Sequence, residues 1–419
     1  MKRILSIDIA RGLVMVIMAL DHTRDLLHVD SLTQSPTDLA TTTPILFFTR
    51  WITHLCAPSF VFLSGTSAWL SVHRQRTAPA TSAATRTPGT PGSSIRRHFL
   101  IRGIWLIILE FTIVNFALWW DIHFRIIMFQ VIATIGFGFV ALAFLYRLSP
   151  KILAGIGLLI IFGHDLLSPV MLPVNPTARI LLSLLFSNGL FPITPNFSLL
   201  IAYPVIPWLG ILLTGFAAGR IFGMPAEKRK QLLLRGGFAA IGLFLLLRLG
   251  NFYGDPAPWT VQRNWIYSVL SFFNVSKYPP SLLYTLITLG LLFLFLAFLT
   301  HGAASPYEGR EGAASPHDSK EGVFGRILAV YGKVPLFYYL IHWYVLRCAM
   351  FIMVFAEGFH IRDLIFTPFQ FGRPAKGSGL PLAGVYAVWL TIVVLLYPLC
   401  RWYGRYRAAH PEKTLLRYL

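Results

Sequence analysis

The segment SIDIARGLVMVIMALDHTRDLLH, residues 6–28, is the most informative stretch of the chain for its fold. It is long and apolar enough for one helix across a bilayer, which needs about 20 residues. A basic pair precedes it, as in a signal peptide, but charged residues from Asp8 to Asp21 interrupt the apolar run, and no small-residue cleavage site stands before Asp21. We therefore predict a retained first transmembrane helix.

The rest of the chain repeats this apolar character. Of its 419 residues, 55% are hydrophobic and 13% are charged, and the mean hydropathy is +0.64. Soluble domains carry about 25% charged residues, so these values exclude a water-soluble enzyme and a disordered chain. We predict an all-α, polytopic integral membrane helix bundle, a single domain over residues 1–419 with about ten transmembrane helices. They are expected at residues 6–28, 45–71, 99–120, 125–147, 152–172, 198–221, 231–250, 279–300, 330–356 and 381–402.

The net charge of +19 has a pattern that membranes explain and nucleic acids do not. Basic residues are dense in every second connection, as the positive-inside rule requires. An even number of spans puts both termini on one side, and the basic ends of the chain make that side the cytoplasm. We predict a lipid bilayer as the environment and no nucleic-acid partner.

The connections fall into two kinds. Residues 73–98 and 301–322 are polar and rich in small residues, so we predict flexible cytoplasmic connections without chemistry. The outward connections 173–197 and 250–278 are rich in Pro, Asn and aromatic residues. They are candidates for shaping an acceptor pocket on the outer face, and ordinary packing at the membrane interface is the alternative.

The first span holds the densest set of ionisable residues, which are costly inside a membrane and mark function by default. Arg11 and His22 lie three helical turns apart, so they share one face at about 16 Å along the axis. An arginine near the cytoplasmic end can bind phosphate, and a histidine in the outer half can take a proton from a nucleophile. The alternative is structural, with Asp8 neutralising Arg11 and His22 bonded to a neighbouring helix.

Other intramembrane groups are candidates for the same site. Glu110 has only Thr112 as a polar neighbour within a turn, so it needs a partner from another helix. His54 lies within the second span, and His342 follows a Gly-Lys-x-Pro break that could line a cavity. For both histidines a packing role is the alternative. The chain has no HExxH or CxxC motif, so we predict no metal site.

Five segments in order give the chain a family resemblance: SIDIARGLVMVIMALDH (residues 6–22), APSFVFLSGTSAWL (57–70), YPVIPWLGILLTGFAAGRIF (203–222), SKYPPSLLYTLITLG (276–290) and YGKVPLFYYLIHWYVL (331–346). With these segments the chain resembles the catalytic-domain family of heparan-α-glucosaminide N-acetyltransferase over essentially its full length. The spacing of Arg11 and His22 also resembles the acyltransferase-3 superfamily, in which an Arg and a His on the first helix serve acyl transfer.

The resemblance implies a membrane acyltransferase that moves acetyl from cytoplasmic acetyl-CoA to an amino sugar or glycan at the outer face, in a bacterial inner membrane. In the lysosomal branch of the family an Asn stands at the position of His22, and the catalytic His comes later, where His28 is the nearest candidate. Both histidines therefore stay open as the base. The alternative function is a proton-coupled secondary transporter of a small solute.

The resulting assignments cover three groups of residues. The expected catalytic residues are His22, Asp21, His28 and Glu110. The expected donor-binding residues are Arg11, Asp8 and Lys333, and the expected acceptor-binding residues are His54, Arg50 and His342. A homodimer is also expected.

Overall fold

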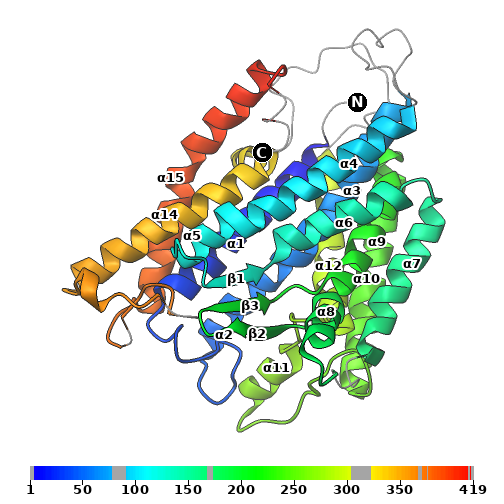
Figure 1. Cartoon of the computed structure of the whole chain (residues 1–419). Helices are drawn as coiled ribbons and strands as arrows, with labels where there is room; N and C mark the ends of the chain where they lie inside the picture. Colours follow the sequence, from blue (N-terminus) through cyan, green and yellow to red (C-terminus); the bar gives the residue numbers. More distant parts are fainter. Residues whose placement is uncertain are drawn as a thin grey trace.

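The computed structural model describes residues 4–77, 91–167, 173–302, 322–366, 370–374, 376–413 and 416, so most of the two predicted flexible connections, residues 78–90 and 303–321, lies outside the described residues. Helices dominate the described part (Figure 1). The longest are α1 (Leu5–Leu27), α3 (Cys56–Thr77), α4 (Pro91–Leu109), α10 (Ala226–Gly250), α14 (Pro335–Ala356) and α15 (Leu382–Ala409). The shorter ones are α2 (Pro44–Ile52), α5 (Asn115–Trp119), α6 (Val131–Leu145), α7 (Pro150–Gly163), α8 (Pro176–Phe186), α9 (Val205–Ala218), α11 (Trp265–Phe273), α12 (Leu282–Phe298) and α13 (Val323–Lys333).

The helices have the lengths and composition of a membrane protein. Within the described residues, seven helical segments are long and apolar enough to cross a bilayer: Pro44–Thr77, Ile95–Trp119, Pro150–Leu167, Val205–Gly223, Ala226–Gly250, Pro335–Ala356 and Leu382–Ala409. Three shorter apolar helices are Val131–Leu145, Pro176–Phe186 and Leu282–Phe298. The chain is therefore a multi-pass helical membrane protein, and the count of ten spans stays a prediction.

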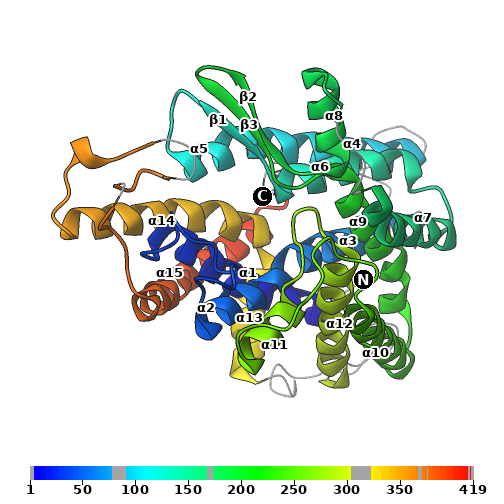
Figure 2. The same cartoon turned by 90° about the horizontal axis from the view of Figure 1, so that it is seen from below.

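The fold departs from the all-α prediction in one place, a three-stranded sheet beside α5 and α6 (Figure 2). Strand β1 (Ile126–Phe129) pairs in parallel with β3 (Phe197–Ile201), and β2 (Gly189–Thr194) pairs with β3 in antiparallel fashion. Residues 125–147 and 198–221 were each expected to be one helix, but each begins with a strand. The reason is that periodicity does not separate a short buried strand from the end of an apolar helix.

Helix α1 lies inside the bundle, although it is not among the seven segments that are long and apolar enough to cross a bilayer. It packs against α3, α12, α13, α14 and α15. One part of the core is built largely from α3, α9 and α12, and another from α1, α14 and α15. The position of α1 allows its polar side chains to meet residues from distant parts of the sequence.

Helices α1 and α13 cross at two glycines. A Cβ atom on Gly12 would lie 1.8 Å from the carbonyl oxygen of Leu328, and one on Gly332 would lie 1.7 Å from the carbonyl oxygen of Asp8. Any side chain at either position would force the helices apart, which is why small residues recur at such crossings in membranes.

Candidate active site

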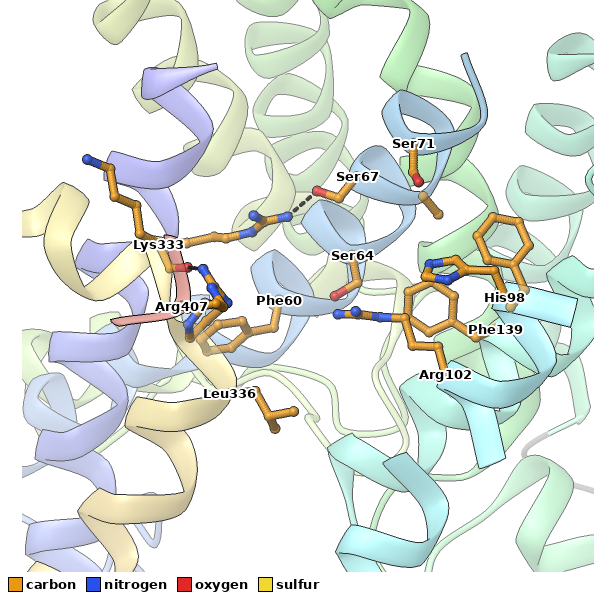
Figure 3. Close-up of a pocket in the computed structure, with 14 residues that line it drawn as sticks. Phe60, Ser64, Ser67, Ser71, His98, Arg102, Phe139, Lys333, Leu336 and Arg407 are labelled. Atoms are coloured by element: carbon orange, nitrogen blue, oxygen red, sulfur yellow. Dashed lines mark hydrogen bonds between the residues drawn. The ribbon is translucent and has the colours of Figure 1, made fainter. Parts of the chain in front are cut away.

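A cavity of about 270 Å³ lies beside Arg11, and we call it the cationic cavity. In Figure 3, Lys333 and Arg407 lie on one side of it and His98 and Arg102 on the other, with serines of α3 between them. None of the described residues that line it is acidic. Five basic side chains and three hydroxyl groups therefore face a common space, which is the composition of an anion-binding site: Arg11, His98, Arg102, Lys333, Arg407, Ser64, Ser67 and Ser71.

Arg11 is held in this wall by α3. Its Nη2 donates to the carbonyl oxygen of Leu63 at 3.0 Å and to the hydroxyl of Ser67. Its Nη1 lies 3.9 Å from Oδ1 of Asp8, so the structure brings the predicted pair together. Asp8 is not among the residues that line the cavity. The guanidinium is thus oriented in advance for an anion.

An apolar pocket of about 90 Å³, which we call the apolar channel, adjoins the cationic cavity. The two share six lining residues: Phe60, Ser64, Arg102, Phe139, Pro335 and Leu336. Met15 and Met18 also line the channel, and they lie one and two turns along α1 from Arg11, toward His22. The channel therefore follows the helix face that the spacing of Arg11 and His22 indicates.

His22 lines a further space of about 280 Å³, the outer cavity. A neighbouring cavity of about 510 Å³ shares Asp25, Lys277 and Tyr278 with it. Arg50 and His54, which we expected to bind the acceptor, line this neighbouring cavity. One helix thus carries Arg11 in the wall of one cavity and His22 in the wall of another.

His22 and His342 form a hydrogen-bonded pair. The Nδ1 atom of His22 lies 2.7 Å from Nε2 of His342, and Nδ1 of His342 lies 3.1 Å from the carbonyl oxygen of Tyr338. A carbonyl oxygen only accepts, so Nδ1 of His342 carries a proton and its Nε2 accepts from Nδ1–H of His22. In this neutral chain of two imidazoles, Nε2 of His22 keeps a lone pair.

The ring of His22 is fixed by stacking as well. It lies against the ring of Trp343, with centroids 4.1 Å apart and planes at 21°. His342 is fully buried and is not among the residues that line the four cavities described here. The structure therefore places His342 behind His22, whereas we expected it to bind the acceptor.

Asp21 is the centre of an ion cluster. It lies 2.9 Å from Nη2 of Arg24, 3.0 Å from Nη1 of Arg50 and 3.8 Å from Nζ of Lys277. Both carboxylate oxygens are engaged by these cations. The expected helper carboxylate of His22 therefore organises three basic side chains of the outer cavities.

His28 lies just past the end of α1 and is held by a loop. Its Nδ1 accepts from the backbone N–H of Asp30 at 3.3 Å, and its carbonyl oxygen accepts from Arg373 at 2.9 Å. Burial lowers the pKa of Arg373 to about 10, which leaves it protonated at neutral pH. The side chain of His28 is not among the outer-cavity residues.

Glu110 finds its partner in the backbone of another helix. Its Oε2 accepts from the N–H groups of Ile132 at 2.9 Å and Ala133 at 3.1 Å, in the first turn of α6. Glu110 also begins a π-helical turn, Glu110–Val114. The structure does not bring it into the outer-cavity wall with His22.

Several residues that line these cavities were not predicted from the sequence. Arg407 comes from the last helix, and Lys277 lies within the outward connection 250–278, so neither has a local signal that links it to α1. Gln130 follows β1 directly, and that strand was not expected. Arg102 does have a signal, since it is a cation inside an apolar span.

Comparison with known families gives one match. A family model described as "Heparan-alpha-glucosaminide N-acetyltransferase, catalytic" matches residues 3–250, which is more than half of the chain. No curated protein matches the chain. The matched region contains Arg11, His22 and Arg102, whereas Lys333 and His342 lie beyond it.

Proposed function

Because the chain belongs to the heparan-α-glucosaminide N-acetyltransferase catalytic family, we propose that it transfers acetyl from acetyl-CoA to an amino sugar or glycan across the membrane. One observation carries the proposal, the series of spaces along α1. The cationic cavity lies at Arg11, the apolar channel at Met15 and Met18, and the outer cavity at His22. This order supports a donor that enters from one end and an acceptor that enters from the other.

The chemistry of the inner walls fits acetyl-CoA. Its phosphates match Arg11, Arg102 and Lys333, because guanidinium and ammonium groups form charge-assisted hydrogen bonds to phosphate. Its narrow thioester arm matches the apolar channel, whose walls would exclude water. In this proposal Asp8 orients Arg11 and does not touch the donor.

We assign the proton transfer to Nε2 of His22. That atom keeps its lone pair because Nδ1–H donates to His342. After proton uptake at Nε2, Nδ1–H still donates to His342, so the ring keeps its orientation through the reaction. His342 is thus a positioning residue in this proposal, and we favour His22 over His28 as the base, because Nδ1 of His28 already accepts a backbone hydrogen bond.

Acetyl transfer can follow two routes that give the same products. In direct transfer, the acceptor amine or hydroxyl attacks the thioester carbonyl carbon while His22 takes its proton. In the two-step route, His22 attacks first and the acceptor then takes the acetyl group from the imidazole. In both, the C–S bond breaks, an acetyl–acceptor bond forms, and the released thiolate receives the proton.

The acceptor would lie against the residues that the two outer cavities share. Asp25 and Tyr278 offer it charge and hydrogen bonds, and Lys277 lies beside them in the ion cluster of Asp21. Asp21 keeps Lys277 and Arg50 in place, and Arg50 and His54 would contact more distant parts of a glycan.

The proposed orientation puts the cationic cavity at the cytoplasmic face of a bacterial inner membrane. Arg11 near the start of α1 and Arg407 in the last turn of α15 line this one cavity, so the first helix begins and the last helix ends on the same side. Basic termini favour the cytoplasm. A homodimer stays a prediction.

Acetyl-CoA binding to the detergent-purified full chain tests the proposal. Titration calorimetry should show binding that weakens with salt, because phosphate contacts are screened. Arg102→Gln should weaken it further, and the exposed Arg362→Gln should serve as an unchanged control. A chain that binds no acetyl-CoA would contradict the proposal and favour a transporter of a small solute, which has no reason to bind it.

A further inference from the structure

Gln130 is a buried amide without an explained role. It lines the outer cavity together with His22, is only 8% exposed, and its Nε2 has no hydrogen-bond partner among the described residues. Buried side-chain donors are nearly always hydrogen-bonded, and an unsatisfied one needs an explanation. A donor kept unpaired in a cavity wall is suited to a ligand atom.

The place of Gln130 specifies which ligand atom that is. It stands between β1 and α6, and the next two residues, Val131 and Ile132, line the apolar channel. Gln130 therefore marks the corner between the channel and the outer cavity. A thioester that reaches along the channel toward His22 would present its carbonyl group at this corner.

The corner is rigid. Phe129, the last residue of β1, pairs with Ile201 of β3. The carbonyl oxygen of Gln130 accepts from the N–H of Thr134 at 3.1 Å, which starts α6. Oε2 of Glu110 accepts hydrogen bonds from the N–H groups of Ile132 and Ala133. Such fixed donors stabilise developing charge without reorganisation during the reaction.

The ammonium group of the outer-cavity wall has a partner. Nζ of Lys277 lies 3.8 Å from Oδ2 of Asp21 and 5.1 Å from the centroid of the Tyr278 ring. Its positive charge is thus directed to the ion cluster. The unpaired amide of Gln130 has no such competing contact.

We propose that the side-chain N–H of Gln130 is the oxyanion donor of the acetyl transfer, which rests on the proposed function. When the nucleophile attacks the thioester carbonyl carbon, the electron pair of the C=O double bond moves to oxygen, and Gln130 donates a hydrogen bond to that oxygen. The pair then reforms the double bond and the C–S bond breaks. With the acceptor as nucleophile, the thiolate takes the proton held by His22; with His22 as nucleophile, it takes the proton that the acceptor releases in the second step. The role is the same for the acceptor and for His22 as nucleophile.

The test reads the carbonyl bond directly and needs no turnover. Acetyl-CoA, isotope-labelled at the carbonyl carbon, is bound to the His22→Ala full chain, and its stretching band is recorded by difference infrared spectroscopy. A hydrogen bond from Gln130 should move the band to lower wavenumber, and the added change Gln130→Leu should remove that shift. In the chain with His22 intact, Gln130→Leu should lower kcat by about 10²- to 10³-fold at unchanged acetyl-CoA affinity.

The possible results separate a failure of the oxyanion role of Gln130 from a failure of the proposed function. An identical carbonyl band with Gln130 and with Leu would overturn the oxyanion role. Loss of acetyl-CoA binding in Gln130→Leu alone would also overturn it, because Gln130 would then hold the donor or the fold. If the His22→Ala chain and the parent both bind no acetyl-CoA, the proposed function itself fails. The exposed Gln34→Leu is the matched control and should change neither band nor kcat.

Discussion

Replacing His342 tests the hydrogen-bonded pair on which the proposed base depends. His342→Leu keeps an apolar group of similar size in a fully buried position but removes the acceptor 2.7 Å from Nδ1 of His22. The Nδ1–H group is then left unpaired, and this loss is greater for the imidazolium that forms in the transition state than for the neutral ring, by about 1–3 kcal/mol. Since each 1.36 kcal/mol corresponds to about tenfold in rate, kcat should fall by roughly 5- to 150-fold.

The assay separates positioning from binding. Acetyl transfer to an amino-sugar acceptor gives kcat, and calorimetry gives the acetyl-CoA Kd, which His342→Leu should leave unchanged. His342→Gln restores an acceptor oxygen and should recover part of the rate. Nitrogen NMR of the histidine side chains should report a proton on Nδ1 of His22 in the parent and a mixture of tautomers in His342→Leu.

Two results would contradict a positioning role of His342. One is full kcat in His342→Leu, which would show that the pair does not prepare His22. The other is equal loss in His342→Leu and His342→Gln with weaker acetyl-CoA binding, which would make His342 a packing residue.

The remaining predictions concern the donor, the base and the α1–α13 crossing. Arg11→Ala should weaken acetyl-CoA binding by about 10- to 150-fold, because charged hydrogen bonds contribute roughly 1.5–3 kcal/mol. His22→Ala should lose about 10²-fold or more in kcat while keeping donor binding, and His28→Ala should lose far less. Gly12→Ala should lower the Tm in detergent, since its Cβ would meet a carbonyl oxygen at 1.8 Å, whereas Gly155→Ala, with nothing within 4 Å, should leave the Tm unchanged or raise it.

Each of these predictions has a result that contradicts it. Unchanged acetyl-CoA affinity in Arg11→Ala would leave Arg11 as a structural partner of Asp8. Full turnover in His22→Ala would move the chemistry to His28 or remove it from α1. Equal Tm values for the two glycine variants would mean that the helices at Gly12 adjust without cost.

The local part of the site follows from the sequence. The first helix was expected at residues 6–28 and spans Leu5–Leu27. Helical geometry alone puts Arg11 and His22 on one face, and the structure shows separate cavities at each of them. The pairing of Asp8 with Arg11 is equally local, because the two are three residues apart.

The non-local part could not be read from the sequence. His342 meets His22 from a helix near the other end of the chain, so no spacing rule links them. Glu110 was expected to need a partner from another helix, and that partner turned out to be backbone. N–H groups in the first turn of a helix have no partner within the helix, so they can bind a carboxylate. That helix start was hidden because residues 125–147 were expected to form one helix, which also concealed Gln130.

Acetyl transfer across a sealed membrane distinguishes a transmembrane acetyltransferase from an enzyme that works on one side only. Full-length protein is reconstituted into liposomes that hold acetyl-CoA inside, and a membrane-impermeant amino sugar is added outside. We expect acetylated sugar outside the liposomes, and intact acetyl-CoA inside liposomes that carry His22→Ala. The protein should consume acetyl-CoA only from the side on which the cationic cavity opens, and salt should slow this consumption. Acetylation that requires donor and acceptor on the same side, or none in liposomes whose protein binds acetyl-CoA, would contradict it.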